Sequence, residues 1–174
     1  MELAHAADIP VEAELGAVWG HEAGPLPPYE ELYASGKGFT DPEEARQFVE
    51  ATGTDWLSVA VGNLHGTIAA AGRQEQKTTA RINLEHLDRI SRKVSIPLVL
   101  HGGTGIGRDS THEAISHGIA KINIGTGIRQ PFEALMEKSI SAAQKAVYEA
   151  ARTLLLVEFN LTGTASLLKA QSGT

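Results

Sequence analysis

The chain has 174 residues, about the length of one domain, and 42% of them are hydrophobic, enough to build a core. With 21 acidic residues against 15 lysines and arginines, the net charge of −6 argues against a nucleic-acid or anionic-membrane partner. There is no apolar stretch near the ~20 residues of a membrane span, no signal-peptide layout at the start and no cysteine, so a cytoplasmic globular protein is expected.

The first strand is predicted over residues 9–16, after what resembles the end of a helix over residues 1–8. A long loop rich in glycine and proline covers residues 17–40. The helix that follows is expected to be capped by Thr40 or Asp41, two residue types that favour a helix start.

The second and third strands are predicted over residues 55–63 and 96–103. Both are nearly continuous apolar runs, which are typical of parallel strands covered on both faces. Between them lie a second long loop, over residues 67–83, and an amphipathic helix over residues 83–94.

The C-terminal part begins with a helix over residues 109–118, for which Ser110 and Glu113 form a capping-box pair. A fourth strand is predicted over residues 119–126. One long amphipathic helix is then expected from residue 130 to beyond residue 148.

This alternation of strands and helices predicts an α/β fold with a parallel sheet and right-handed crossovers. No change in composition marks a boundary, so residues 1–174 are expected to form a single domain. Both long loops follow the carboxyl end of a strand, which is the edge where α/β sheets bind ligands.

Polar and glycine residues gather at the strand ends, namely Glu12, Glu14, Asn63, His65, Gly66, His101, Gly102, Gly103, Thr104, Asn123, Gly125 and Thr126. In a parallel sheet these ends meet at one edge. Two imidazoles and a carboxylate are a ligand set that zinc prefers in catalytic sites. Glycines after His101 would let backbone N–H groups approach an anion such as phosphate.

Each of these residues also has a simpler structural interpretation. A histidine at a strand end can be a surface residue, a glycine-rich turn can be purely steric, and one of Glu12 and Glu14 can face solvent. Lys121 is expected to point outward, and Arg129 to make either an ion pair or an anion contact. The remaining histidines are expected on solvated helix faces, namely His5, His86, His112 and His117.

Four motifs occur in the order "VEAELG", "VGNLHGT", "PLVLHGGTGI" and "KINIGT", with "TDPEEARQFVEATGTDWLSVAVGN" between the first and the second. In this order they resemble the class II, metal-dependent ketose-bisphosphate aldolases, which include fructose-1,6- and tagatose-1,6-bisphosphate aldolases. The resemblance covers about residues 2–135 and, more loosely, the helical tail. It implies the C-terminal half of a TIM (β/α)8 barrel, with four parallel strands, helices and a site at the strand carboxyl ends.

By this resemblance His65 and His101 are zinc ligands, Glu14 is a carboxylate that binds the metal in an alternative position, and Glu22 moves the carbon-bound proton. The cradle for the phosphate and hydroxyls of dihydroxyacetone phosphate matches Gly66, Gly102, Gly103, Thr104, Asn123, Ile124, Gly125 and Thr126. The implied cofactor is Zn²⁺, with a monovalent cation as a further candidate.

The implied reaction is a lyase step of carbohydrate metabolism, in which a ketose 1,6-bisphosphate is cleaved to dihydroxyacetone phosphate and an aldehyde. A zinc ion acts as a Lewis acid on the ketone oxygen, and a carboxylate handles the carbon-bound proton.

The sequence departs from the family in what it lacks. A family barrel has eight strands in ~250 residues, whereas this chain matches the second four and has no counterpart of an Asp-His pair. In the family that aspartate assists proton transfer at the aldehyde oxygen, and that histidine is the third zinc ligand. The "GHEAG" loop and Gly125 also differ from some relatives, which leaves the sugar open.

The chain is therefore expected to be either a fragment of a longer enzyme or a half-barrel that pairs with a copy as a homo-oligomer. Two other functions remain open. One is a non-catalytic half-barrel that binds metal or a sugar phosphate, and the other is a Schiff-base aldolase that uses Lys121.

Overall fold

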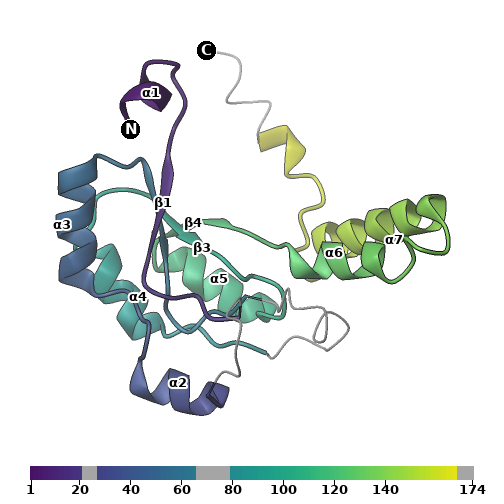
Figure 1. Cartoon of the computed structure of the whole chain (residues 1–174), viewed down its shortest axis with the longest axis horizontal. Coiled ribbons are helices and arrows are strands. Elements are labelled where there is room, and N and C mark those ends of the chain that lie inside the picture. Colours follow the sequence, from purple (N-terminus) through teal and green to yellow (C-terminus); the bar gives the residue numbers. More distant parts are fainter. Residues whose placement is uncertain (21–26, 66–78, 168–174) are drawn as a thin grey trace. The chain divides into compact units, whose positions relative to one another are not determined.

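The computed structural model describes residues 1–20, 27–65 and 79–167. Within these ranges the strands form one parallel sheet in the order β1-β2-β3-β4, so that each strand pairs with the next one in the chain (Figure 1). The strands are β1 (Glu12–Leu15), β2 (Trp56–Val59), β3 (Leu98–Leu100) and β4 (Ile119–Ile122). The predicted α/β fold with four parallel strands is confirmed, although each strand is shorter than its predicted range.

The described chain forms two compact units, Met1–Thr126 and Gly127–Thr174, and the sheet belongs to the first. The helices of that unit are α1 (Glu2–His5), α2 (Tyr29–Ser35), α3 (Pro42–Thr52), α4 (Leu84–Ser91) and α5 (Arg108–Ser116). Helix α6 (Thr126–Glu133), helix α7 (Ile140–Thr153) and the π-helix η2 (Leu154–Glu158) follow. The expectation of a single domain over residues 1–174 stays a prediction.

Local side-chain chemistry sets the starts of two helices that lie beside the sheet. The Asp41 carboxylate caps α3 by accepting hydrogen bonds from the backbone N–H groups of Glu43 at 2.9 Å and Glu44 at 2.8 Å. The Asn83 side chain caps α4 by accepting from the N–H of His86 at 3.0 Å. Both caps satisfy N–H groups that have no partner inside the helix.

Alternate residues of β2 and β3 build the core. The residues of this outer face are fully buried or nearly so, namely Leu57, Val59, Leu98 and Leu100. They pack in one cluster with residues of helices α3, α4 and α5, including Ala45, Leu87, Ile90 and Ala114. Because successive side chains of a strand point to opposite faces, this packing fixes which residues lie on the other face.

The opposite, inner face of the sheet carries the polar residues. The register pairs Glu12 with Trp56, and it aligns Glu14, Ser58, Val99 and Lys121 across the four strands. These six residues define the inner face.

Three sequence predictions about helices were wrong. The single helix expected from residue 130 is two helices, because Ser139 starts α7 anew by accepting a hydrogen bond from Ala142 N–H at 3.3 Å. Helix α5 begins at Arg108 with Gly107 as its N-cap, so Ser110 lies inside the helix and forms no capping box. The predicted loop over residues 17–40 contains α2, which ends at Gly36 in the left-handed conformation at φ +64°.

Candidate metal site

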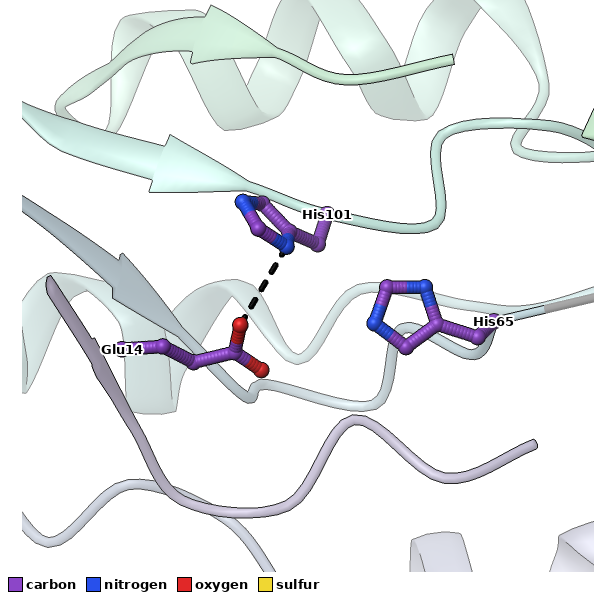
Figure 2. Close-up of side chains that lie close together, drawn as sticks. All are labelled: Glu14, His65 and His101. Atoms are coloured by element: carbon purple, nitrogen blue, oxygen red, sulfur yellow. Dashed lines mark ion pairs between the residues drawn. The ribbon is translucent and has the colours of Figure 1, made fainter. Parts of the chain in front are cut away.

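Three of the predicted site residues come together at the carboxyl ends of their strands. Glu14, His65 and His101 each offer one ligand atom, and these atoms lie within 4.8 Å of one another. Figure 2 shows the Glu14 carboxylate and the two imidazoles gathered from β1 and from the segments that follow β2 and β3. His101 Nδ1 lies 3.3 Å from Glu14 Oε2, and the two imidazole centroids are 5.8 Å apart.

The outer-face packing places His101. Leu100 is fully buried on the outer face, so the next residue, His101, turns to the inner side of the sheet. Its ring is largely shielded, with 21% of the side-chain surface exposed, whereas the Glu14 side chain is 38% exposed. The candidate site is thus open on its Glu14 side.

Asn63 ties the two histidine-bearing segments together. This residue is only 2% exposed; its Oδ1 accepts from Val61 N–H at 2.8 Å, and its Nδ2 donates to the His101 carbonyl at 3.0 Å. The backbone N–H of His65 donates to the Trp19 carbonyl at 2.7 Å. The sequence marked Asn63 only as a polar strand end, since a contact with a segment 38 residues away leaves no local signal.

The glycines after His101 have a steric reason to be glycine. Gly102 has φ +67°, and a Cβ there would lie 1.9 Å from the Leu64 carbonyl oxygen. A Cβ on Gly103 would lie 2.6 Å from Ile122 Cγ2, and the Gly103 N–H donates to the Asn123 carbonyl at 3.0 Å. The segment after β3 is therefore packed tightly between its neighbours, and phosphate binding there stays a prediction.

The other predicted cradle residues follow β4 or lie beside these glycines. Asn123 N–H donates to the Leu100 carbonyl at 2.9 Å, whereas a Cβ on Gly125 would meet open space. Thr126 begins α6, so residues 123–126 run from a strand end into a helix N-terminus. Their role in binding substrate, like that of Thr104 and Ile124, stays a prediction.

Two predicted site residues, Glu22 and Gly66, lie outside the described residues. Arg129 has an ion pair with Glu133 at 2.7 Å, which is one of the two alternatives considered for it. His5, His86 and His117 are more than solvated side chains, since their rings lie 2.8 Å from Asp55, 2.7 Å from the Thr40 carbonyl and 3.6 Å from Asp88.

The prediction that Lys121 points outward was wrong. A register shift between Leu98 and Val99 places Lys121 opposite Val99 on the inner face. There Lys121 Nζ donates to Glu12 Oε2 at 2.6 Å and lies 5.1 Å from the centroid of the Trp56 ring. An irregularity of this kind reverses the face of a side chain and cannot be read from the local sequence.

Both oxygens of the Glu12 carboxylate contact other side chains. Its Oε1 lies 2.7 Å from His101 Nε2, while its Oε2 accepts from Lys121. Burial opposes ionisation of the Glu12 carboxyl, but the hydrogen bonds from Lys121 and His101 outweigh it and hold its pKa below the ordinary value. Glu12 is therefore an ionised carboxylate beside the candidate ligands.

The donor set fits a divalent metal ion. Two partly buried imidazoles and one exposed carboxylate, close together, match catalytic zinc sites that keep a position open for water or substrate.

No helix of the described ranges is long and apolar enough to cross a membrane.

Comparison with known proteins gives one family and several relatives. The model of the family "Fructose-bisphosphate aldolase class-II" matches residues 1–163. Over 126 residues the chain is 47% identical to the uncharacterized protein YdjI of Escherichia coli K12 and 37% identical to a fructose-bisphosphate aldolase of Staphylococcus epidermidis. These alignments cover 72% of this chain but only 40% and 39% of those proteins, so the chain spans less than half their length.

Solved structures show the same fold. The crystal structure of the YdjI aldolase from E. coli K12 superposes with a TM-score of 0.63 at 34% identity, over 93% of this chain and 52% of that one. A fructose-bisphosphate aldolase from Campylobacter jejuni superposes with a TM-score of 0.58 over 90% of this chain and 53% of that one, at 18% identity, which supports the fold alone.

Proposed function

The chain belongs to the class-II fructose-bisphosphate aldolase family, and we propose that it carries a zinc-dependent site for cleaving a ketose 1,6-bisphosphate to dihydroxyacetone phosphate and an aldehyde. The observation that supports this most strongly is the gathering of Glu14, His65 and His101, with ligand atoms within 4.8 Å, at the carboxyl ends of parallel strands. That is the edge at which barrels of this kind hold their active sites.

Each residue has a distinct task in the proposed site. His65 and His101 would hold the ion through imidazole nitrogens together with Glu14, and zinc would supply Lewis-acid polarisation of a ketone oxygen. Glu22 takes and returns the carbon-bound proton. The backbone of residues 102–104 and 123–126, together with Gly66, binds the phosphate and hydroxyls, and a monovalent cation is a further candidate there.

The reaction needs a metal site, a phosphate cradle, a proton shuttle at carbon and an acid/base at the aldehyde oxygen, and these residues do not offer candidates for all four. Candidates exist for the metal site, the phosphate cradle and the proton shuttle at carbon, but the sequence has none for the acid/base at the aldehyde oxygen. Loss of such a group costs about 10²–10⁴-fold in rate. These 174 residues alone are therefore expected to cleave ketose bisphosphates feebly or not at all, yet to exchange the carbon-bound proton slowly.

Deuterium exchange tests this proposal. The zinc-loaded chain is incubated with dihydroxyacetone phosphate in heavy water, and NMR follows the loss of the carbon-bound proton. The chain should show slow exchange, Glu22→Gln should lower the rate by about 10²–10⁴-fold, and Glu31→Gln on α2 serves as the exposed control.

Two results would count against the proposal. Absence of exchange with zinc demonstrably bound would favour a non-catalytic half-barrel that binds metal or sugar phosphate. Full aldolase turnover from these residues alone would show that an acid/base for the aldehyde oxygen has been overlooked.

A Schiff-base mechanism on Lys121 is disfavoured. Its Nζ donates to Glu12 Oε2 at 2.6 Å, so the nitrogen that would have to attack a carbonyl carbon is engaged with a carboxylate. Borohydride with substrate should leave Lys121 unmodified, whereas a chelator should abolish the exchange reaction.

We also propose that the chain forms a homo-oligomer. Strands β1 and β4 are the edges of the described sheet, and an unpaired parallel edge favours pairing with another chain. Light scattering that gives the mass of a monomer would contradict this assembly.

A further inference from the structure

We propose that Glu12, held in place by Lys121, is a positioning residue that fixes the orientation and the protonated nitrogen of His101 for metal binding. The inference rests on the proposed zinc site and adds to it a pair of residues that would touch neither metal nor substrate.

The hydrogen-bond geometry assigns the nitrogens of His101. Glu12 Oε2 accepts a hydrogen bond from Lys121 Nζ at 2.6 Å, and Glu12 Oε1 lies 2.7 Å from His101 Nε2. With the Glu12 carboxylate as the acceptor in both contacts, Nε2 is the donor and carries the proton. Nδ1 then keeps its lone pair, and this is the nitrogen that lies 3.3 Å from Glu14 Oε2 in the ligand cluster. Histidines that bind metal typically donate their other N–H to a carboxylate in this way.

Lys121 makes this arrangement compatible with two carboxylates on one face. Glu12 and Glu14 both contact His101, and without a cation their charges would repel at close range. The Lys121 ammonium neutralises Glu12 at 2.6 Å, and the Trp56 ring, whose centroid lies 5.1 Å from Nζ, supports it from the side. Lys121 thus offsets the charge of Glu12, and Glu14 faces Nδ1 of His101.

The pair also spans the sheet. Glu12 lies in β1 and Lys121 in β4, with two strands between them, a separation of roughly 14 Å at the usual strand spacing. The two side chains meet over the inner face, and the second oxygen of Glu12 contacts His101 at the end of β3. If Glu12 and Lys121 only linked β1 to β4, their removal would change the stability of the fold. It would not change which nitrogen of His101 faces the candidate metal site.

The experiment combines a zinc-free and a zinc-bound measurement on the whole chain. Histidine-labelled protein without metal, at about pH 8 where an ordinary imidazole is neutral, should give a resolved Nε2–H proton signal for His101, identified by its loss in His101→Ala. The contact with Glu12 slows exchange of this proton with water. Zinc affinity is then measured by competition with a chromophoric chelator.

Two variants separate positioning from charge. Glu12→Ala should lose the Nε2–H signal and bind zinc about 10–100-fold more weakly. Glu12→Gln keeps the side-chain volume and an acceptor oxygen, so it should retain the signal and bind zinc more tightly than Glu12→Ala. Glu85→Ala, at an exposed glutamate of α4, should match the wild type in both measurements.

Unchanged zinc affinity in Glu12→Ala would overturn the inference. Equal losses of affinity in the Ala and Gln variants would overturn it too, because Glu12 would then act through charge alone. A wild-type chain that shows the Nε2–H signal but binds no zinc would instead refute the proposed function, since the contact would exist without a metal to serve.

Discussion

The two faces of the sheet differ in composition although they are built from the same short strands, because the charged residues of the strands all lie on the inner face. On the outer face Leu57 and Leu98 are packed under helices, while on the inner side Glu12 and Glu14 contact His101, and Lys121 contacts Glu12. Because neighbouring residues in a strand point to opposite faces, the leucines that stabilise the fold also aim the polar residues. Stability and metal binding should therefore respond to different substitutions.

The largest expected effect on stability comes from the outer face. Leu98→Ala removes a side chain that is 1% exposed and leaves a cavity, which should lower the free energy of unfolding by ~2–5 kcal/mol in denaturant titration. Leu3→Ala, at a side chain that is 91% exposed, is the control and should change it by less than ~0.5 kcal/mol. Zinc affinity of the folded Leu98→Ala protein should stay near the wild-type value. A Leu98→Ala protein that loses zinc affinity but keeps wild-type stability would contradict this division of roles between the two faces.

The smallest expected effect lies on the helix-covered side, at the exposed Glu43. Hydrogen bonds from Arg46 and Lys93 lower the pKa of the Glu43 carboxyl from 4.5 to about 2. Since the folded-state pKa is depressed, the stabilisation is present above the unfolded value and disappears as the pH falls from about 4.5 toward 2.

The melting temperatures of wild type and Glu43→Gln should therefore differ slightly above pH 4.5 and converge as the pH falls toward 2. Glu85→Gln, another exposed glutamate, should show no such convergence. A difference between wild type and Glu43→Gln that stays constant over this pH range would contradict the ion-pair explanation.

Much of the fold was predictable because its signals are local. Continuous apolar runs indicated the buried strands, and the Asp41 cap required only neighbouring residues. Helix α2 was missed because it is short and lies in a segment rich in glycine and proline. The break between α6 and α7 was missed because the amphipathic pattern continues across it.

The site divides in the same way. That His65, His101 and a carboxylate would converge followed from the parallel strand order, since the carboxyl ends of such strands share one edge. The choice of Glu14 over Glu12 as the ligand came from the family resemblance. The contacts of Glu12 with His101 and Lys121 depend on the register shift at β3–β4 and on side chains that reach across the sheet. These features arise only in the folded structure, so no residue spacing in the sequence predicts them.

Zinc affinity of single-histidine variants tests the central claim most directly. Wild type, His65→Ala, His101→Ala and the exposed control His112→Ala are compared in zinc-binding titrations against the same chelator. The proposed site predicts that His65→Ala and His101→Ala each weaken zinc binding ~10–100-fold or more, because even the loss of a side chain that only contacts a metal ligand has an effect of this size. His112→Ala should leave zinc binding unchanged. Wild-type affinity in His65→Ala or His101→Ala would contradict the assignment of these residues as the metal site.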